Sequence, residues 1–255
     1  MKQVTATIIS NSKVTRDFYL IWLDSHEIAT KAKPGQFVMV RCGERTLLRR
    51  PLSIHQRDDN KIALLFSVVG KGTAWLSQRK AGDNIDIFGP LGNGFSISPD
   101  SRNLLLVAGG IGIAPLCFLA QQALSQGCSV TLLYGTRTEH RYPENLLPTG
   151  IKLVAATEDG TVGEKGMISN LLPDFTDRAD QIFACGPIPM YHDMYVRREK
   201  LLKAKPVQVS LEVRMGCGRG LCYGCTIKTK SGLKKVCQDG PVFDLDDVLW
   251  DKLVL

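Results

Sequence analysis

Four cysteines near the C-terminal end have a spacing that could hold an inorganic cluster: Cys217, Cys222, Cys225 and Cys237. The first three follow the pattern C-x4-C-x2-C, and eleven residues separate the third from the fourth. This is the ligand pattern of a plant-type 2Fe-2S cluster, in which four thiolates hold two irons bridged by sulfide. The spacing therefore predicts a site that carries one electron at a time.

The residues around these cysteines suit a tight loop. Four of them are glycines: Gly216, Gly218, Gly220 and Gly224. Glycine allows positive φ, which lets backbone N–H groups approach the cluster sulfurs. A structural zinc site also uses four thiolates, but it usually has two C-x2-C pairs, and here only Cys222 and Cys225 form one. The pattern favours the iron–sulfur cluster over zinc.

The remaining cysteines stand singly: Cys42, Cys117, Cys128 and Cys185. Without paired spacing they are expected to be reduced residues in or near the core. The first ten residues contain no apolar signal-peptide region and no small-residue cleavage site. Reduced thiols and a cluster together predict a cytoplasmic protein.

Two features of composition could mislead. The formal net charge is +7, but Lys and Arg are dispersed without a basic, aromatic-rich run, so we predict no nucleic-acid partner. Bound anionic cofactors offset much of this charge, leaving roughly +3. The uncharged stretch Leu104–Leu124 is long enough to suggest a membrane span, but three glycines and Pro115 interrupt it. A buried parallel strand followed by a helix explains it better, so no membrane partner is predicted.

The N-terminal part, residues 1–98, alternates strand patterns with turn signals. Strands are predicted over residues 4–9, 17–23, 36–41, 53–56, 62–69 and 84–88, with one helix over 73–79. Six strands at this spacing predict an antiparallel β-barrel.

The rhythm changes over residues 99–205, where strand patterns alternate with helical ones. Strands are predicted over 104–108, 130–134, 152–156 and 181–184, and helices over 115–125, 166–172 and 189–202. This alternation predicts a doubly wound parallel sheet with ligands at the carboxyl ends of its strands. Residues 206–255 are predicted to be a small segment organised around the cluster.

Two motifs in the predicted barrel could bind phosphate. One is Arg49-Arg50-Pro51-Leu52-Ser53 at a strand end, and the other is Gly70-Lys71-Gly72-Thr73 at the start of a helix. A guanidinium can fork onto a phosphate, and a glycine-rich turn offers free N–H groups. Each motif alone is more often an ordinary strand end or turn, but both precede a nucleotide-type domain.

Glycine-containing turns follow all four predicted strands of the second domain. The first, Gly109-Gly110-Ile111-Gly112-Ile113-Ala114-Pro115, leads from strand to helix as a pyrophosphate turn does, although it departs from G-x-G-x-x-G. The others are Gly135-Thr136-Arg137, Glu158-Asp159-Gly160 and Cys185-Gly186-Pro187. Each could be an ordinary connecting loop, but together they predict a dinucleotide crevice.

These motifs, in this order, resemble the ferredoxin reductase family, which binds FAD in a barrel and a nicotinamide dinucleotide in a second domain. The segments Arg214–Cys225 and Lys235–Phe243 narrow the likeness. They resemble the electron-transfer subunits of type B dihydroorotate dehydrogenase, and the likeness covers essentially the whole chain.

The resemblance implies roles for individual residues. The expected FAD contacts are Arg50, Pro51, Leu52, Ser53, Val68, Val69, Gly70, Gly72 and Thr73. The expected NAD contacts are Gly109, Gly110, Gly112, Pro115, Thr136, Arg137, Gly186 and Pro187. Cys185 would lie near the reacting nicotinamide carbon as a catalytic residue, although a small packing residue is an equal alternative. Glu212, just before the cluster loop, could face the flavin, but a solvated strand residue is the favoured interpretation. Arg137 leaves NADP open beside NAD.

The resemblance also implies a function and a partner. A partner subunit carrying FMN would oxidise dihydroorotate to orotate in pyrimidine biosynthesis, and its electrons would pass through the cluster and FAD to NAD+. The complex would be a heterotetramer, and this chain alone would act only as a diaphorase. The alternatives are a related FAD and 2Fe-2S reductase subunit of the sulfide dehydrogenase, ferredoxin-NADP or hydrogenase diaphorase type, or a redox sensor without turnover.

Overall fold

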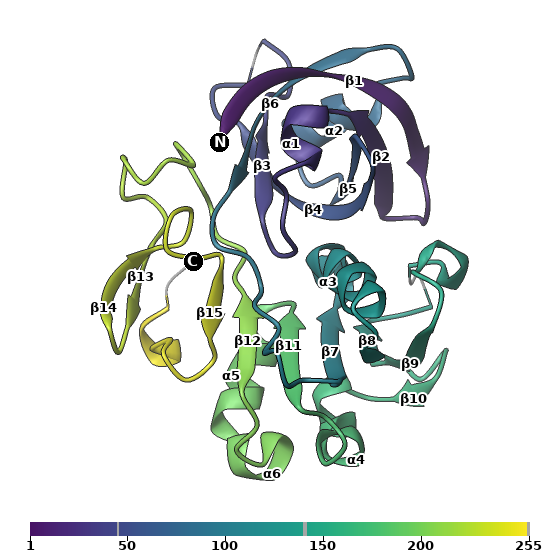
Figure 1. Cartoon of the computed structure of the whole chain (residues 1–255), viewed down its shortest axis with the longest axis vertical. Helices are drawn as coiled ribbons and strands as arrows, with labels where there is room; N and C mark the ends of the chain where they lie inside the picture. Colours follow the sequence, from purple (N-terminus) through teal and green to yellow (C-terminus); the bar gives the residue numbers. More distant parts are fainter. Residues whose placement is uncertain (45, 140–141, 254–255) are drawn as a thin grey trace.

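A closed six-stranded barrel forms the N-terminal part of the computed structural model, which describes residues 1–44, 46–139 and 142–253 (Figure 1). Its strands are β1 (Lys2–Lys13), β2 (Phe18–Asp24), β3 (Phe37–Val40), β4 (Arg50–Asp58), β5 (Lys61–Ser67) and β6 (Asn84–Leu91). They pair in the order β1-β2-β5-β4-β3-β6, and the short helices α1 (His26–Ala29) and α2 (Lys71–Ser77) lie in its connections. The predicted antiparallel barrel is confirmed.

Alternation of side chains explains why these strands close on themselves. In β1, Ala6 and Ile8 are buried, whereas Thr5 and Thr7 are exposed. Successive side chains of a strand point to opposite faces, so one face of the curled sheet fills the barrel and the other meets solvent.

The second part is a seven-stranded sheet below the barrel (Figure 1). Its strands are β7 (Asn103–Gly109), β8 (Ser129–Thr136), β9 (Ile151–Thr157), β10 (Glu164–Lys165), β11 (Gln181–Cys185), β12 (Val207–Ser210) and β15 (Val242–Asp244). Their order is β10-β9-β8-β7-β11-β12-β15, and only the β12–β15 pair is antiparallel. The predicted doubly wound parallel sheet is confirmed, because strand order reverses between β7 and β11.

Helices connect these strands. They are α3 (Ile113–Ser125), α4 (Leu172–Thr176), α5 (Ile188–Val196) and α6 (Arg198–Leu202), with short 3-10 turns η1 (Gly110–Gly112), η2 (Glu144–Leu146) and η3 (Ile168–Leu171). The uncharged stretch 104–124 is β7 followed by α3, and α3 lies between the sheet and the barrel, packed against β4. Among the described residues, no helix is long and apolar enough to cross a membrane.

The C-terminal part is joined to the sheet. Besides the hairpin of β13 (Thr226–Thr229) and β14 (Gly232–Lys235) and the turn η4 (Trp250–Lys252), it supplies β12 and β15. The predicted boundary at residue 205/206 therefore precedes a strand that pairs with β11. In Figure 1 this part, coloured yellow-green to yellow, lies beside both the barrel and the sheet.

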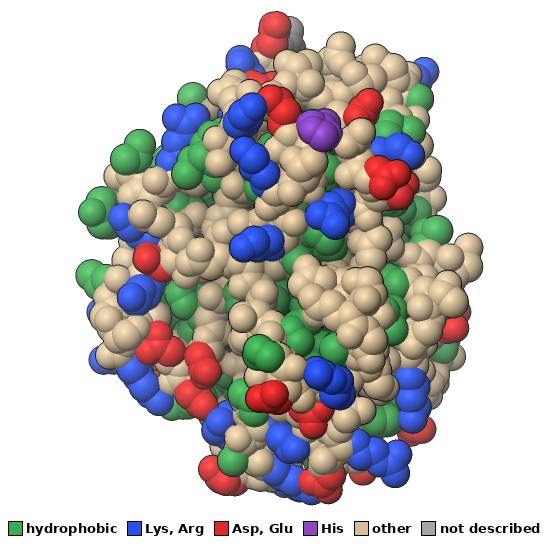
Figure 2. All heavy atoms as spheres, viewed as in Figure 1, with side chains coloured by type: hydrophobic (Ala, Val, Ile, Leu, Met, Phe, Trp, Pro, Cys, Tyr) green, Lys and Arg blue, Asp and Glu red, His purple; other side chains and the backbone are tan. Residues whose placement is uncertain are grey.

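The molecular surface carries both charges. On the face shown in Figure 2, Lys and Arg side chains are spread over both halves, with Asp and Glu side chains between them. This distribution follows the dispersed charge pattern of the chain.

Candidate cofactor sites

One cavity of about 790 Å³, here called the barrel cavity, lies between the barrel and the segment that follows β12. Six of the predicted FAD residues line it: Arg50, Pro51, Leu52, Ser53, Val69 and Thr73. Val68 and Gly70 are exposed beside it, and neither lines the cavity. Gly72 lies behind it, where a Cβ would come within 2.8 Å of Arg50 Nε, so glycine leaves room for that side chain.

The two adjacent arginines differ in what they bind. Arg49 donates to both carboxylate oxygens of Asp86, at 2.6 and 3.0 Å. Arg50 donates only to the carbonyl oxygen of Leu48, at 2.8 Å, and forms no ion pair among the described residues. Arg50 is therefore the guanidinium whose charge remains available for a phosphate in the cavity, which fits an anionic cofactor.

Thr73 has a structural role in the turn that opens α2. Its hydroxyl accepts hydrogen bonds from the N–H groups of Val69 and Gly70, at 2.9 and 3.3 Å, and is buried. These bonds hold the turn beside Arg50 in one conformation.

A second cavity of about 680 Å³, here called the nucleotide cavity, lies at the carboxyl ends of the parallel strands. The predicted NAD residues that line it are Gly109, Gly110, Gly112, Thr136, Arg137, Gly186 and Pro187. Pro115 is buried in the first turn of α3 and does not line it. The described geometry thus joins turns that are up to 78 residues apart, from position 109 to 187, around one crevice.

Close backbone approach explains the glycines of this cavity. A Cβ on Gly109 would come within 2.6 Å of Pro187 Cδ, and a Cβ on Gly112 would collide with the carbonyl group of Cys185. Only glycine lets the turn after β7 pack directly against the turn after β11. This contact builds the floor of a crevice in which N–H groups at the start of α3 can meet a pyrophosphate.

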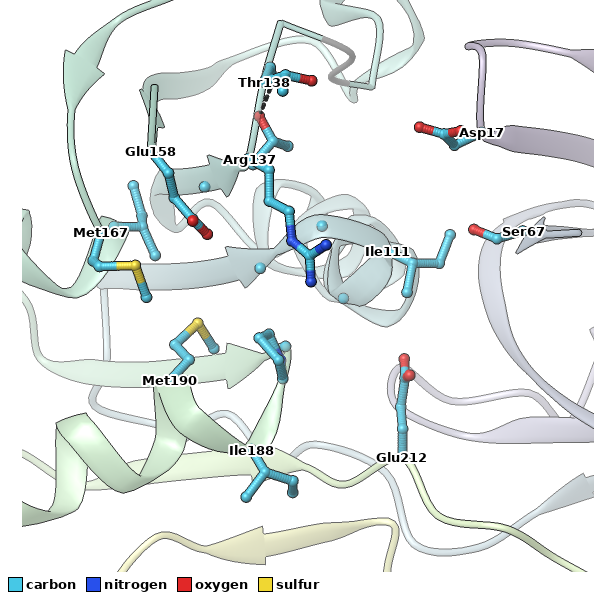
Figure 3. Close-up of a pocket in the computed structure, with 18 of the residues that line it drawn as sticks. Asp17, Ser67, Ile111, Arg137, Thr138, Glu158, Met167, Ile188, Met190 and Glu212 are labelled. Atoms are coloured by element: carbon cyan, nitrogen blue, oxygen red, sulfur yellow. Dashed lines mark hydrogen bonds between the residues drawn. The ribbon is translucent and has the colours of Figure 1, made fainter. Parts of the chain in front are cut away.

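Figure 3 shows charged side chains that enter the nucleotide cavity from different elements. Arg137, after β8, extends into it, and Glu158, after β9, points its carboxylate toward the same space. Asp17 and Ser67 face it from the barrel side. The cavity therefore has a basic and an acidic group at neighbouring strand ends.

Cys185 is fully buried at the end of β11 and is not among the residues lining either cavity. Its thiol contacts the side chains of Tyr191 and Ser210, and burial raises its pKa well above the usual value. The thiol is therefore protonated behind the cavity wall, and its predicted role beside the nicotinamide stays a prediction.

The two cavities share a wall. Four residues line both of them: Ser67, Val69, Ile111 and Glu212. Glu212 is exposed where it faces the two cavities, and partial desolvation by the surrounding protein raises the pKa of its carboxyl. The side chain is exposed, as expected, but it lies beyond β12 rather than within a strand, and the space that it faces is that of the two cavities. Its place two residues after the end of a parallel strand was the available signal, because ligands bind at such ends.

Three of the predicted cluster ligands lie in the loop before β13 and the fourth, Cys237, lies in the turn after β14, and the four form two contacting pairs. Cys217 contacts Cys222, and Cys225 contacts Cys237. No group of three or more Cys, His, Asp or Glu side chains in the described part of the chain is arranged around a single metal ion. Two thiol pairs match two irons, each of which takes two thiolates beside the bridging sulfides.

Backbone N–H groups point at these sulfurs. Arg219 and Leu221 donate to Cys217 Sγ at 3.3 and 3.4 Å, and Gly220 donates to Cys237 Sγ at 3.2 Å. Although burial opposes it, hydrogen bonds from Arg219, Cys222 and Leu221 lower the pKa of Cys217 to about 6. The φ of Gly220, +77°, is one that side-chain-bearing residues rarely adopt. The loop is thus preorganised for negative charge on sulfur.

The cysteine loop rests on the barrel. A Cβ on Gly218 would come within 2.7 Å of Met39 Cγ in β3, and the guanidinium of Arg219 lies 4.2 Å from the ring centre of Phe88 in β6. Met215, two residues before Cys217, lines the barrel cavity. Two residues of extended chain span at most about 7 Å, so the cavity and the first cluster cysteine are near neighbours.

Known proteins share this organisation. Residues 212–249 match the iron-sulfur cluster binding domain of dihydroorotate dehydrogenase B. The electron transfer subunits of dihydroorotate dehydrogenase B (NAD(+)) from Desulforamulus reducens and Caldanaerobacter subterraneus subsp. tengcongensis are 39% and 36% identical to the chain, covering 98% and 97% of it and 99% of each relative.

Solved structures agree. A structure of the NADH-dependent reduced ferredoxin-NADP oxidoreductase has a TM-score of 0.88 at 31% identity, covering 97% of this chain and 91% of that one. A ferredoxin reductase in carbazole 1,9a-dioxygenase has a TM-score of 0.67 at 21% identity, covering 82% and 68%, and shares the fold. The chain therefore belongs to the family of electron transfer subunits of dihydroorotate dehydrogenase B.

Proposed function

We propose that this chain passes electrons from an FMN-containing catalytic subunit, which oxidises dihydroorotate to orotate, through a 2Fe-2S cluster and FAD to NAD+. The observation that carries this proposal is the unbroken series of three sites. The nucleotide cavity shares a wall with the barrel cavity, and Met215 connects the barrel cavity to the cysteine loop. The names of the relatives support the substrate and the acceptor.

Each cofactor has residues that fit it. Arg50 and the turn of α2 would hold the FAD phosphates, and the turns after β7 and β11 would hold the dinucleotide. When bound, a flavin exchanges two electrons with a nicotinamide and single electrons with an iron–sulfur cluster. The protein binds and orients these groups, and Ile111 and Glu212 lie in the wall between the two cavities.

Glu158 supports NAD rather than NADP as the dinucleotide. A carboxylate at the end of the strand can accept hydrogen bonds from ribose hydroxyls, but it repels a 2′-phosphate. Arg137, which left NADP open, lies in the same cavity, so the two charges oppose each other there. We propose that the carboxylate decides the preference.

The exposed edge of the cysteine loop supports transfer to a partner. Cys222 is exposed, and its neighbours Leu221 and Tyr223 are 73% and 66% exposed. A cluster held there would lie near the surface, where a second redox protein can approach. We propose a cytoplasmic heterotetramer with the catalytic subunit, acting in pyrimidine biosynthesis.

Reconstitution tests this function. The isolated holoprotein should reduce artificial acceptors with NADH and form no orotate, whereas addition of the catalytic subunit should give dihydroorotate-dependent reduction of NAD+. Orotate formation by the chain alone, or failure of the two subunits to couple, would contradict the proposal.

A second candidate function rests on the similarity to the NADH-dependent ferredoxin-NADP oxidoreductase. In that case the chain would serve a different partner with the same cofactors. Co-purification from the native organism distinguishes the two. In the second case, the purified complex would not contain the FMN-containing subunit that oxidises dihydroorotate. A redox sensor without turnover would show flavin that NADH does not bleach.

A further inference from the structure

A buried tyrosine hydroxyl joins the walls of the two cavities. Tyr191, in α5, is fully buried. Its hydroxyl accepts a hydrogen bond from the N–H of Gly186 at 2.7 Å and donates one to the carbonyl oxygen of Ser210 at 2.7 Å. Gly186 lines the nucleotide cavity, and Ser210 lines the barrel cavity.

The two hydrogen bonds of the Tyr191 hydroxyl lie just beyond the end of the β11–β12 ladder. The parallel pair of β11 and β12 ends at Cys185 and Ser210. Ile182 N–H donates to the carbonyl oxygen of Pro206 in this ladder, so the same spacing would next join the Gly186 N–H to the carbonyl oxygen of Ser210. Those two groups bond to the Tyr191 hydroxyl instead. The hydroxyl of Tyr191 thus takes the place of the next rung between the two strands, at the point where both enter cavity walls.

The ring of Tyr191 is fixed from the C-terminal part of the chain. Its centre lies 5.3 Å from the ring centre of Trp250, which is itself buried and donates its indole N–H to the carbonyl oxygen of Leu245 at 2.9 Å. The side chain of Tyr191 therefore contacts the wall of the nucleotide cavity, the wall of the barrel cavity and the C-terminal part of the chain that holds the cysteines.

We propose that Tyr191 is a positioning residue that fixes the Cys185–Pro187 turn against the end of β12, and so sets the nucleotide cavity relative to the barrel cavity. The proposal rests on the proposed function of these cavities in binding NAD and FAD. Nothing in it requires the hydroxyl to touch either cofactor.

Removal of the hydroxyl alone should release the turn. In Tyr191→Phe the ring keeps its contact with Trp250, but the N–H of the half-buried Gly186 and the carbonyl of the buried Ser210 lose their partner. A buried polar group without a partner is unfavourable, so the turn should move until it finds another. Because the turn lines only the nucleotide cavity, the loss should appear in dinucleotide binding rather than in FAD or cluster content.

The test compares three holoproteins: the natural chain, Tyr191→Phe and Tyr195→Phe. Tyr195 is a half-buried tyrosine of the same helix whose ring lies 6.0 Å from Lys230 Nζ, away from both cavities. Calorimetric titration with NAD+ should give a Kd raised about tenfold in Tyr191→Phe and unchanged in Tyr195→Phe. Iron content and flavin absorbance should match in all three, and KM for NADH should rise more than kcat falls.

Two results overturn the proposal. One is a Kd for NAD+ in Tyr191→Phe within twofold of the natural chain, and the other is an equal loss in both variants. Failure of the natural holoprotein to bind NAD+ would instead refute the proposed function. Should Tyr191→Phe not retain its cofactors, hydrogen exchange of the natural holoprotein decides: the Gly186 amide must exchange more slowly than that of Gly110, and equal rates overturn the proposal.

Discussion

The cysteine loop and the junction between the two cavities are both redox sites, but they are built in opposite ways. The loop gathers its four thiols within residues 217–237 and holds them with its own N–H groups. The junction draws its shared wall from residues as distant as Ser67 and Glu212. A site of the first kind is local in sequence and depends on its own loop, whereas a site of the second kind depends on the packing of whole domains.

The largest expected effect breaks the local site. Cys237→Ser should abolish the visible absorption and iron content of the cluster, because three thiolates leave one iron short of a ligand. The flavin absorbance should remain, since the barrel cavity does not use this residue. Cys128→Ser, which alters a buried cysteine outside the loop, is the control and should keep the cluster. Equal iron content in both variants would disprove the ligand set.

The next effect concerns a contact between the barrel and the second domain. His55, in β4, is fully buried between the carbonyl oxygen of Ala114 and the hydroxyl of Tyr142, each 2.9 Å away, and burial lowers its pKa to about 4. The unfolded chain, with a histidine pKa of about 6.5, binds the proton first as pH falls. Stability should therefore decrease by about 3 kcal/mol between pH 6.5 and 4 and level off below.

Urea unfolding across this pH range measures the effect of His55. The decrease of the unfolding free energy with falling pH should flatten in His55→Gln. It should persist in His26→Gln, which changes an exposed histidine of the barrel. If His55→Gln shows the same pH dependence of the unfolding free energy as the natural chain, the buried His55 contact is not its cause.

Arg50 sharpens the comparison within the barrel. Arg50→Ala should weaken FAD binding by about 2 kcal/mol, roughly thirtyfold in Kd, because it removes charge-assisted hydrogen bonds to phosphate. Arg49→Ala should lower thermal stability through loss of the Asp86 pair while FAD affinity changes less than about threefold. FAD titration of the apoprotein measures both. The reverse order of effects would assign the phosphate to Arg49.

The smallest effect concerns the dinucleotide. Glu158→Gln should raise the preference for NADPH relative to NADH about fivefold. The change removes a repulsion between the carboxylate and the 2′-phosphate that is worth about 1 kcal/mol at a solvent-exposed site. Glu164→Gln, in β10 and outside the cavity lining, should leave the ratio unchanged. Ratios of kcat/KM for the two dinucleotides measure this. An unchanged ratio in Glu158→Gln would show that Glu158 does not set the preference between the two dinucleotides.

The sequence predicted the local features best. The strands of the barrel, the parallel sheet and the cysteine set follow from periodicity and spacing, which short segments contain in full. What it missed lies between segments. Glu212 became part of a shared wall only because β12 ends beside β11, and the predicted segment 206–255 did not reveal that β12 and β15 extend the sheet. Cys185 begins a recognisable turn, but spacing does not tell which side of the turn its thiol faces.

An anaerobic titration of the isolated holoprotein with NADH tests the central claim, that the three sites form one continuous path. The account predicts that flavin and cluster absorbance both bleach, with about one and a half NADH consumed per chain, because FAD takes two electrons and the cluster takes one. Bleaching of the flavin alone, with the cluster still oxidised after two NADH per chain, would contradict it.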